Sequence, residues 1–469
     1  MRAIRRRDFL KAAGAGAGLA AMALPRMLRA AEAAARKPNI IVILADDLGY
    51  ADVGLQGCTD IPTPHVDSIG RGGVRLTSGY VSHPFCSPTR AGLMTGRYQQ
   101  RFGHEGNPVY NPANETHGLP LDQVTLPQTL KAAGYVTGMV GKWHLGATPA
   151  MHPMKRGFDE FFGFIGGGHD YFKAEMENVP KEYAIPIQRD GKPVPLTEYL
   201  TDVFGREAAA FIDRHQKEPF FLYLSFNASH TPLQSPEKYQ ERVKNIEDKT
   251  RRLYAALVVA MDDAIGVVLE KLRSTGLEQD TLVFFLSDNG GPGRVTHASN
   301  APLRGNKSDV LEGGVRVPFF VRWPARLPAG KTYDEPVISL DIFPTAVAAG
   351  GGQLPADRRL DGVNILPHLL GQASGPPHER LFWRMGGGAA GAVREGRFKL
   401  VRTDAKPPEL YDLQQDAGEA KDLAADKPEV VERLVKAYDA WNKELVPPLW
   451  GQAGAAAKKK QQKAKEPAA

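Results

Sequence analysis

The chain has 469 residues, of which 42% are hydrophobic and 24% are charged, as in ordinary globular proteins. This composition excludes a largely disordered, collagen-like or multi-span membrane protein. Two cysteines are too few for a disulfide framework or a cysteine-rich zinc module. The formal net charge of +6 comes from the two ends, because residues 1–37 carry +7, residues 451–469 carry +4, and residues 38–450 carry −5. This acidic body argues against a nucleic-acid-binding protein.

Residues 1–35 have the pattern of a twin-arginine signal peptide. Arg6 and Arg7 precede Phe-Leu-Lys, and an Ala/Gly-rich apolar run follows over residues 12–24. The run is too short and too weakly apolar for a membrane-spanning helix, although an amphipathic or disordered tail is an alternative interpretation. We therefore expect the twin-arginine export machinery as a partner, no stable membrane span, and a periplasmic or extracellular protein after signal removal.

Four apolar runs predict strands of a large sheet, at residues 39–45, 220–226, 281–286 and 315–323. The first three are continuous and rich in β-branched or aromatic residues, which is typical of strands covered on both faces. Pro318 places the fourth run away from a regular central ladder. Residues 251–275 show helical spacing of apolar side chains. Strands alternating with helices predict an α/β fold, with a mainly parallel mixed sheet sandwiched by helices.

Polar side chains follow three of these predicted strands. Asp46 and Asp47 follow the first, a segment ending in His230 follows the second, and Asp288 and Asn289 follow the third. Ligands of open α/β sheets bind beyond the carboxyl ends of the strands, so these residues are expected to share one site. The four Asp and Asn residues offer hard oxygen ligands, which favour Ca²⁺ or Mg²⁺ over zinc. Each residue alone could instead cap a turn.

A smaller α+β domain is predicted for residues 376–448, after a large domain at 36–375. Residues 381–384 and 392–401 have the pattern of short strands, and residues 426–445 that of a helix. Residues 449–469 contain five lysines among Ala and Gln and are expected to form a disordered, solvated tail. A weak contact of this tail with a polyanion is the alternative.

Residues 86–97 are the most informative segment. They read Cys-Ser-Pro-Thr-Arg-Ala-Gly-Leu-Met-Thr-Gly-Arg and fit C-x-P-x-R-x-x-L-x-T-G-R without a gap. A chance match to these seven fixed positions is expected in on the order of one in a million chains of this length. The chain therefore resembles the formylglycine-dependent sulfatases of the alkaline-phosphatase superfamily. Residues 134–144, 303–307 and 409–413 are also similar to segments of that family, so the resemblance covers roughly residues 38–445.

The resemblance implies an alkaline-phosphatase-like fold and hydrolysis of organic sulfate esters to an alcohol and inorganic sulfate. It implies that a formylglycine-generating maturation enzyme oxidises Cys86 to formylglycine (3-oxoalanine) before folding. One hydroxyl of the hydrated aldehyde then attacks sulfur, and the other later expels the sulfate. The implied metal is Ca²⁺, or alternatively Mg²⁺, bound by Asp46, Asp47, Asp288, Asn289 and the modified Cys86.

The resemblance also implies roles for five further residues. Arg90, one helical turn beyond the nucleophile, would stabilise the modified side chain. Lys142 and Lys307 would bind the sulfate oxygens. His144 would hydrogen-bond the diol and take the proton when the aldehyde reforms, and His230 would protonate the leaving alcohol.

Two segments bear on the substrate. Well-known animal members of the family have a Ser near the sulfate in the segment aligned with residues 163–170, where this chain has Gly. His169 or Asp170 is therefore the candidate to face the substrate. Residues 300–305 are similar to those of carbohydrate-acting members, which implies a sulfated sugar or glycan and makes Arg304 a candidate substrate-binding residue.

Two other functions stay open. A phosphonate monoester or phosphodiester hydrolase of the same superfamily can carry the same C-x-P-x-R segment. A catalytically silent binder of sulfated glycans, with Cys86 left as a thiol, is the second alternative. His104, His117 and His152 have no motif context and are interpreted as structural or exposed, and Cys58 as an ordinary small residue.

Overall fold

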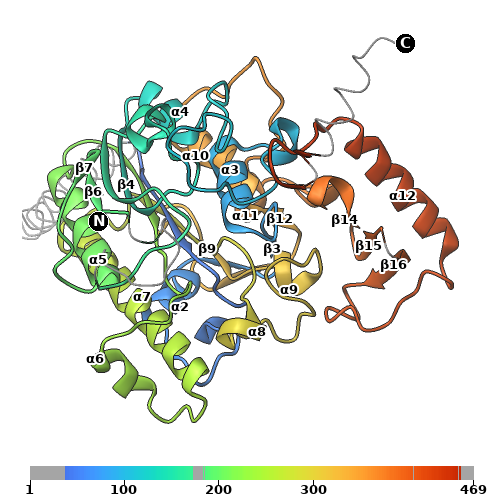
Figure 1. Ribbon diagram of the computed structural model, residues 1–469, viewed down its shortest axis with the longest axis horizontal. Coiled ribbons are helices and arrows are strands. Elements are labelled where there is room, and N and C mark those ends of the chain that lie inside the picture. The colour runs from blue at the N-terminus through green and yellow to red at the C-terminus, as the bar shows by residue number, and fades with distance from the viewer. Residues whose placement is uncertain (1–36, 173–182, 184, 405, 453, 456–469) are drawn as a thin grey trace, which may run out of the picture.

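A ten-stranded mixed sheet forms the centre of the larger domain (Figure 1). The computed structural model describes residues 37–172, 183, 185–404, 406–452 and 454–455. The strand order is β11-β2-β10-β9-β1-β8-β4-β5-β6-β7. The central parallel strands are β1 (Asn39–Ala45), β4 (Val136–Lys142), β5 (Glu160–Phe164), β8 (Phe220–Ser225) and β9 (Thr281–Ser287). The outer strands of this sheet are β2 (Val74–Leu76), β6 (Gln188–Arg189), β7 (Lys192–Pro193), β10 (Phe319–Arg322) and β11 (Lys331–Tyr333).

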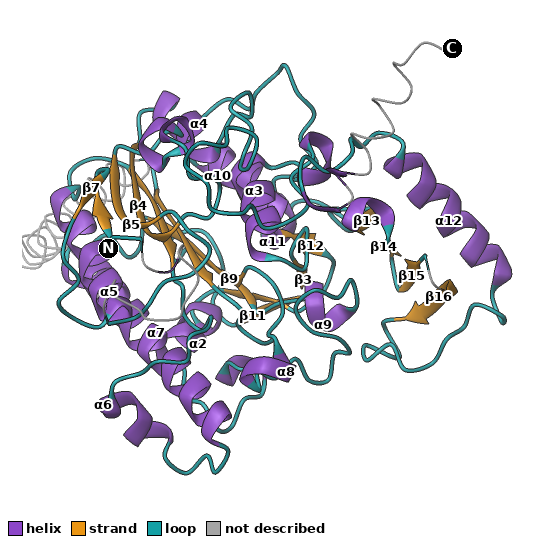
Figure 2. Ribbon diagram, in the orientation of Figure 1, coloured by secondary structure: helices purple, strands orange, loops and turns teal. Residues whose placement is uncertain are grey.

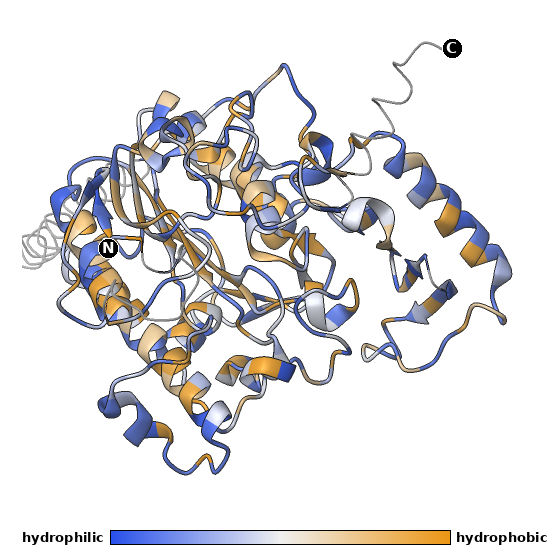
Figure 3. Ribbon diagram, viewed as in Figure 1, coloured by the Kyte–Doolittle hydropathy of each residue, from blue (hydrophilic) through white to orange (hydrophobic). Residues whose placement is uncertain are grey.

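Helices cover both faces of this sheet (Figure 2). One face of β1 packs with α3 (Cys86–Thr95), α4 (Leu126–Ala132) and α10 (Ile342–Ala349). The other face packs with α2 (Pro64–Arg71), α5 (Leu200–Arg214) and α7 (Lys249–Ser274). Every residue of β1, β8 and β9 is buried, which is why these strands are continuous apolar runs, and hydrophobic residues follow the central strands in Figure 3. The predicted helix-sandwiched, mainly parallel sheet is confirmed.

The fourth predicted strand differs from the structure. Its first residue, Val315, ends the short helix α9 (Glu312–Val315), and β10 begins at Phe319, directly after Pro318. Proline has no N–H for a ladder, so the strand starts only beyond it. β10 then lies inside the sheet, antiparallel to both β9 and β2, rather than away from the central ladder.

Short elements complete the domain: α6 (Glu237–Gln240), α8 (Gly293–Thr296), α11 (Leu366–Leu369) and the pair β3 (Gly79–Tyr80) and β12 (Val337–Ile338).

The smaller unit lies at one side of the molecule and is α+β (Figure 1). Its antiparallel sheet consists, in order, of β13 (Arg380–Met385), β14 (Ala390–Glu395), β15 (Phe398–Thr403) and β16 (Lys406–Asp412). Helix α12 (Pro428–Asn442) contacts β14 and β15. The β14–β15 hairpin turns at Gly396, whose φ of +55° suits glycine.

The chain beyond α12 returns to the larger domain. The Leu449 amide donates a hydrogen bond to the Gly103 carbonyl at 2.9 Å, and the Trp450 ring centroid lies 4.7 Å from that of His104. Residues 449 and 450 are thus packed against the larger domain, although the sequence analysis expects the disordered tail to begin at 449.

The signal segment 1–35 and the lysines of the tail lie outside the described residues. Within the described part of the chain, no helix has the length and apolarity needed to cross a membrane.

A buried charge cluster joins the two units. The ammonium of Lys399, on β15, lies 2.9 Å from Glu312 Oε1 and 3.0 Å from Glu419 Oε1, and all three side chains are fully buried. The Tyr80 hydroxyl donates to Glu312 Oε2 at 2.7 Å. Glu312 opens α9, so the smaller sheet is attached to the segment that follows residues 303–307.

We expect Lys399→Ala to destabilise the fold by about 3–5 kcal/mol, because it leaves two buried carboxylates without their cation. Thermal and urea unfolding of the full chain measure the change. Lys436→Ala, which removes an exposed lysine from α12, is the matched control. Equal stability of the two variants would contradict the importance of this cluster.

Candidate functional site

The site lies where the carboxyl ends of β1, β8 and β9 meet. β1 pairs in parallel with both neighbours, in register up to its last residues. The amide of Asp46 donates to the Ala228 carbonyl at 2.9 Å, and that of Asp288 donates to the Ala45 carbonyl at 3.0 Å. These bonds continue the ladders beyond the strands. The sheet itself therefore fixes the backbone of the polar residues that follow each strand.

Cys86, the first residue of α3, meets the carboxylates at this edge. Its Sγ lies 3.5 Å from Asp46 Oδ1 and 4.0 Å from Asp47 Oδ1. Ligand atoms of Asp46, Asp47, Cys86 and Asp288 all lie within 4.8 Å of one another. The four residues are buried, and we call them the acidic cluster. The segment after β1, the segment after β9 and the start of α3 thus converge on one point.

Asn289 completes the acidic cluster. Its Nδ2 donates to Asp47 Oδ1 at 2.7 Å, while its buried Oδ1 has no hydrogen-bond partner among the described residues. A buried amide oxygen without a partner is costly, and it is a ligand that a hard cation prefers. The donor set of three carboxylates, an amide oxygen and the Cys86 side chain therefore fits Ca²⁺ or Mg²⁺.

Each carboxylate of the cluster has a cationic neighbour. Lys142, the last residue of β4, places Nζ 2.5 Å from Asp46 Oδ2. Arg90 donates to Asp288 Oδ2 through Nη2 at 2.7 Å and Nε at 3.0 Å, and Lys307 Nζ lies 2.8 Å from Asp47 Oδ2. Arg90 and Lys142 are fully buried.

The pKa shifts follow from burial and these charges. Burial alone would raise the pKa of Asp47, but the charge of Lys307 holds it below its usual range. Burial and the Asp46 carboxylate raise the pKa of Asp288 to about 6, because Arg90 only partly offsets them. The three basic side chains thus do not fully compensate the carboxylates, and a bound cation would supply the missing charge. Burial also raises the pKa of Cys86, so its side chain is a neutral thiol rather than a nucleophilic thiolate.

Two histidines border the acidic cluster. His230 has Nε2 3.8 Å from Asp47 Oδ2, and its Nδ1 lies 2.7 Å from the Thr231 carbonyl. His144 is buried, has a φ of +59°, and has no hydrogen-bond partner at Nδ1 among the described residues. Burial, followed by the positive charges of Lys307 for His230 and Lys142 for His144, lowers both pKa values, to about 3 for His230. Both imidazoles are therefore neutral here.

The glycine-rich loop at 166–168 explains how His144 is accommodated. A Cβ on Gly167 would lie 2.7 Å from His144 Nε2, so a larger residue would displace the ring. A Cβ on Gly168 would similarly lie 2.3 Å from the Tyr183 ring. The glycines of this loop thus permit close approach of side chains.

The three predicted substrate-binding residues lie in different surroundings. His169 is buried, with Nδ1 2.6 Å from the Asp170 carbonyl and Nε2 2.7 Å from the Ile185 carbonyl. Asp170 accepts a hydrogen bond from the Phe172 amide at 2.7 Å. Arg304 faces the smaller unit, where it donates to the Tyr411 hydroxyl at 3.0 Å. In this conformation both His169 nitrogens thus contact the main chain, and Arg304 lies at the domain junction.

Sequence reasoning missed a supporting pair behind Cys86. Ser87 Oγ donates to the His144 carbonyl at 2.6 Å and lies 2.6 Å from His104 Nε2. Ser87 and His104 are both fully buried, and Trp450 covers the His104 ring. The arrangement ties α3 to the backbone of His144. An isolated histidine carries no signal in sequence, so His104 could be found only from the fold.

Known families and proteins resemble the chain over most of its length. The family model described as Sulfatase matches residues 38–352, and the one described as N-sulphoglucosamine sulphohydrolase, C-terminal, matches residues 306–443. The N-acetylgalactosamine-6-sulfatase of Canis lupus familiaris is 35% identical, over 79% of this chain and 72% of its own. Arylsulfatase A of Bos taurus is 34% identical, over 87% of this chain and 88% of its own. The crystal structure of Ps i-CgsB in complex with k-i-k-neocarrahexaose is 36% identical, covers 92% of this chain and 98% of its own, and has a TM-score of 0.85.

We expect Ca²⁺ or Mg²⁺ to stabilise chelator-treated protein. At a hundredfold excess over Kd, binding to the folded state alone adds about 2.7 kcal/mol, which raises Tm by a few degrees. Asn289→Ala, which removes an amide oxygen without changing the charge, should raise the Kd of the cation at least about tenfold. Thermal melts over a cation titration measure both effects.

Asp263→Asn is the matched control for this titration. Asp263 belongs to another group, with His65 and Asp262, which shares no residue with the acidic cluster. Equal cation dependence of Asn289→Ala and Asp263→Asn would show that the cation binds outside the acidic cluster.

Proposed function

The chain belongs to the sulfatase family and is a sulfuric ester hydrolase, and from this premise we propose that it is an exported enzyme that removes sulfate from glycans by means of formylglycine made from Cys86. The observation that carries the proposal is the position of Cys86. Its side chain lies against the carboxylates of Asp46 and Asp47, close to the buried side chains of Arg90 and Lys142. Such a site neutralises the charge of a bound sulfate ester while it holds the nucleophile.

Formylglycine would replace a side chain that is unreactive as it stands. Cys86 is completely buried and its thiol is neutral, so a maturation enzyme would act on the chain before it folds. When present, the hydrated aldehyde supplies the hydroxyl that attacks sulfur. Arg90, one turn further along α3, supports this position through its bonds to Asp288.

A divalent cation would be held by Asp46, Asp47, Asp288, Asn289 and the modified Cys86. When bound, it supplies a Lewis acid for the sulfate oxygens and the nucleophile. The charges of the site support this assignment. Three carboxylates face Arg90, Lys142 and Lys307. The single negative charge of a bound sulfate ester would offset part of the charge of a divalent cation, and the sulfate dianion released as product would offset all of it.

The two lysines would bind the sulfate oxygens, and the two histidines would transfer protons. Lys142 is buried and its pKa is raised, because the Asp46 carboxylate outweighs the effect of burial, so it remains an ammonium that binds a sulfate oxygen. Lys307 would bind a second oxygen. His144, neutral and with an Nδ1 that has no hydrogen-bond partner among the described residues, would hydrogen-bond the diol and take the proton when the aldehyde reforms. His230 would carry a proton on Nε2 once the anionic ester is bound, and would deliver it to the leaving alcohol.

A sulfated glycan is the proposed substrate. Support comes from the relatives, one of which is an N-acetylgalactosamine-6-sulfatase and another of which is Ps i-CgsB, in complex with a neocarrahexaose. Within this chain, His169, Asp170 and Arg304 remain candidates for contacts beyond the sulfate. His169 and Asp170 would act after a change in their loop, and Arg304 from the domain junction.

The proposed route begins with the twin-arginine signal at residues 1–35. The maturation enzyme would act in the cytoplasm, and the folded protein would then be exported to the periplasm or beyond. The proposed division of the mature chain is a catalytic domain at 36–375, a smaller domain at 376–448 and a Lys-rich tail at 449–469. Only the packed start of that tail belongs to the described residues.

We expect Cys86→Ala, coexpressed with a formylglycine-generating enzyme, to lose at least about 10³-fold in nitrophenyl sulfate hydrolysis, because the nucleophile is gone. Cys58→Ala should retain activity, since Cys58 contacts Asp60 outside the site. Mass spectrometry of the wild-type peptide should show the loss of one sulfur and two hydrogens and the gain of one oxygen at residue 86, where a carbonyl oxygen replaces the SH group and one hydrogen. Active protein that carries only the thiol would refute the mechanism.

The phosphonate alternative has its own test. The matured enzyme should hydrolyse nitrophenyl sulfate with a larger kcat/KM than nitrophenyl phenylphosphonate. A much faster phosphonate reaction would replace the sulfatase proposal with a phosphonate hydrolase. Protein that keeps Cys86 as a thiol despite coexpression with the maturation enzyme, and that binds sulfated oligosaccharides without hydrolysing them or either ester, would favour the silent glycan binder.

His104→Ala should lower kcat about tenfold with little change in KM, because Ser87 would no longer hold the His144 carbonyl in a fixed position. His104→Gln, which keeps an N–H donor, should recover part of the loss. Steady-state kinetics, normalised to formylglycine content by mass, measure the effect. A loss confined to folded yield, with normal kcat, would mean that His104 only stabilises the fold.

A further inference from the structure

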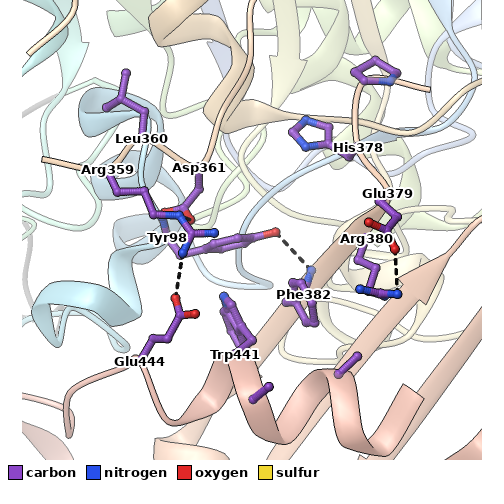
Figure 4. Close-up of a pocket in the computed structure, with 13 residues that line it drawn as sticks. Tyr98, Arg359, Leu360, Asp361, His378, Glu379, Arg380, Phe382, Trp441 and Glu444 are labelled. Carbon is purple, nitrogen blue, oxygen red and sulfur yellow. Dashed lines mark hydrogen bonds and ion pairs between the residues drawn. The ribbon is translucent and has the colours of Figure 1, made fainter. Parts of the chain in front are cut away.

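A cavity lies between the two units, and no residue of the acidic cluster lines it (Figure 4). Its volume is about 420 Å³, within the range of small-molecule sites. Tyr98, which follows the carboxyl end of α3, is part of its lining, whereas Cys86 begins that helix. The ten residues of α3 place the two sites about 14 Å apart along the helix axis. The cavity is therefore separate from the catalytic site.

Three aromatic side chains contact one another at the cavity. Phe382 and Trp441 are stacked, with centroids 4.9 Å apart and planes at 10°, and Tyr98 meets Trp441 edge-on at 5.2 Å. Figure 4 shows the indole nitrogen of Trp441 directed toward the space between Tyr98 and Phe382. Trp441 is only 6% exposed, yet its Nε1 has no hydrogen-bond partner among the described residues. A buried indole N–H normally donates a hydrogen bond to an acceptor, and an oxygen of a bound ligand would be that acceptor.

The polar rim has charges of both signs. Arg359 Nη1 lies 3.0 Å from Glu444 Oε2, and Arg380 Nη2 lies 2.6 Å from Glu379 Oε1. Asp361 is a third carboxylate of the lining, and Arg101 Nε lies 2.7 Å from its Oδ2. A strongly anionic ligand would meet the carboxylates, and a cationic one the arginines, so neither charge is favoured. A neutral polyhydroxyl compound suits this rim, because each hydroxyl both accepts from arginine and donates to carboxylate. Its C–H faces would pack on the aromatic edges.

We propose that this cavity binds a neutral sugar unit of the glycan chain, with an oxygen of that sugar accepting the Trp441 Nε1 hydrogen bond. The proposal rests on the proposed action on glycans and adds a binding site apart from the reaction centre. Binding one part of a chain here would raise the local concentration of its sulfated units at Cys86. The enzyme would thereby hydrolyse long sulfated chains with a larger kcat/KM than short ones.

The probe for this site is a neocarrahexaose from which all sulfate has been removed. Isothermal titration with the full-length protein should show saturable binding. Trp441→Phe keeps an aromatic ring but removes the N–H, and should raise Kd at least fivefold. Ala440→Trp, at an exposed position of α12 in the cavity lining, should abolish binding by filling the space. Trp450→Phe removes an indole N–H outside the cavity and should leave Kd unchanged.

Hydrolysis of nitrophenyl sulfate separates this proposal from the proposed function. Trp441→Phe and Ala440→Trp should retain wild-type kcat/KM on that small ester, which also shows that they fold, and should lose the advantage for long sulfated chains. Wild-type protein that fails to bind the neutral hexasaccharide overturns the second site while leaving the sulfatase proposal intact. Binding that neither cavity variant weakens also overturns it. Lack of sulfate hydrolysis by matured wild-type protein would refute the function itself.

Discussion

The structure depends on the concentration of negative charge at the carboxyl edge of the sheet. Parallel pairing of β1 with β8 and β9 brings Asp46, Asp47 and Asp288 together in a place closed to solvent. Buried carboxylates in such proximity repel one another unless cations face them. Arg90 from α3, together with Lys142 from β4 and Lys307 from the segment between α8 and α9, supplies those cations. The rest of the fold keeps these elements in contact.

This compensation has consequences for Cys86. The same burial that strengthens the ion pairs makes the thiol inaccessible and keeps it protonated. The proposed conversion of Cys86 to formylglycine would therefore take place before the site closes. The burial that strengthens the ion pairs would exclude a modifying enzyme from the folded protein.

Residues of both units make the contacts that hold the site in place. The Lys399 cluster attaches the smaller sheet to α9, and the segment after α12 places Trp450 over His104. His104 in turn contacts Ser87, the neighbour of Cys86. The smaller unit therefore reaches α3 by packing and hydrogen bonds, without a charged residue of its own in the acidic cluster. The cavity at Trp441 lies in this same junction.

The sequence alone determined the family, the α/β class and the residues of the acidic cluster, because apolar runs, the Cys86 motif and polar strand ends are local signals. It could not place the start of β10, since the α9 turn and Pro318 share an apolar run with the strand. His104, Trp441 and Trp450 carry no local pattern, and the surroundings of His169 and Arg304 depend on distant segments. Only tertiary packing decided these, because their partners lie far away in the chain and are brought close by the sheet and the domain junction.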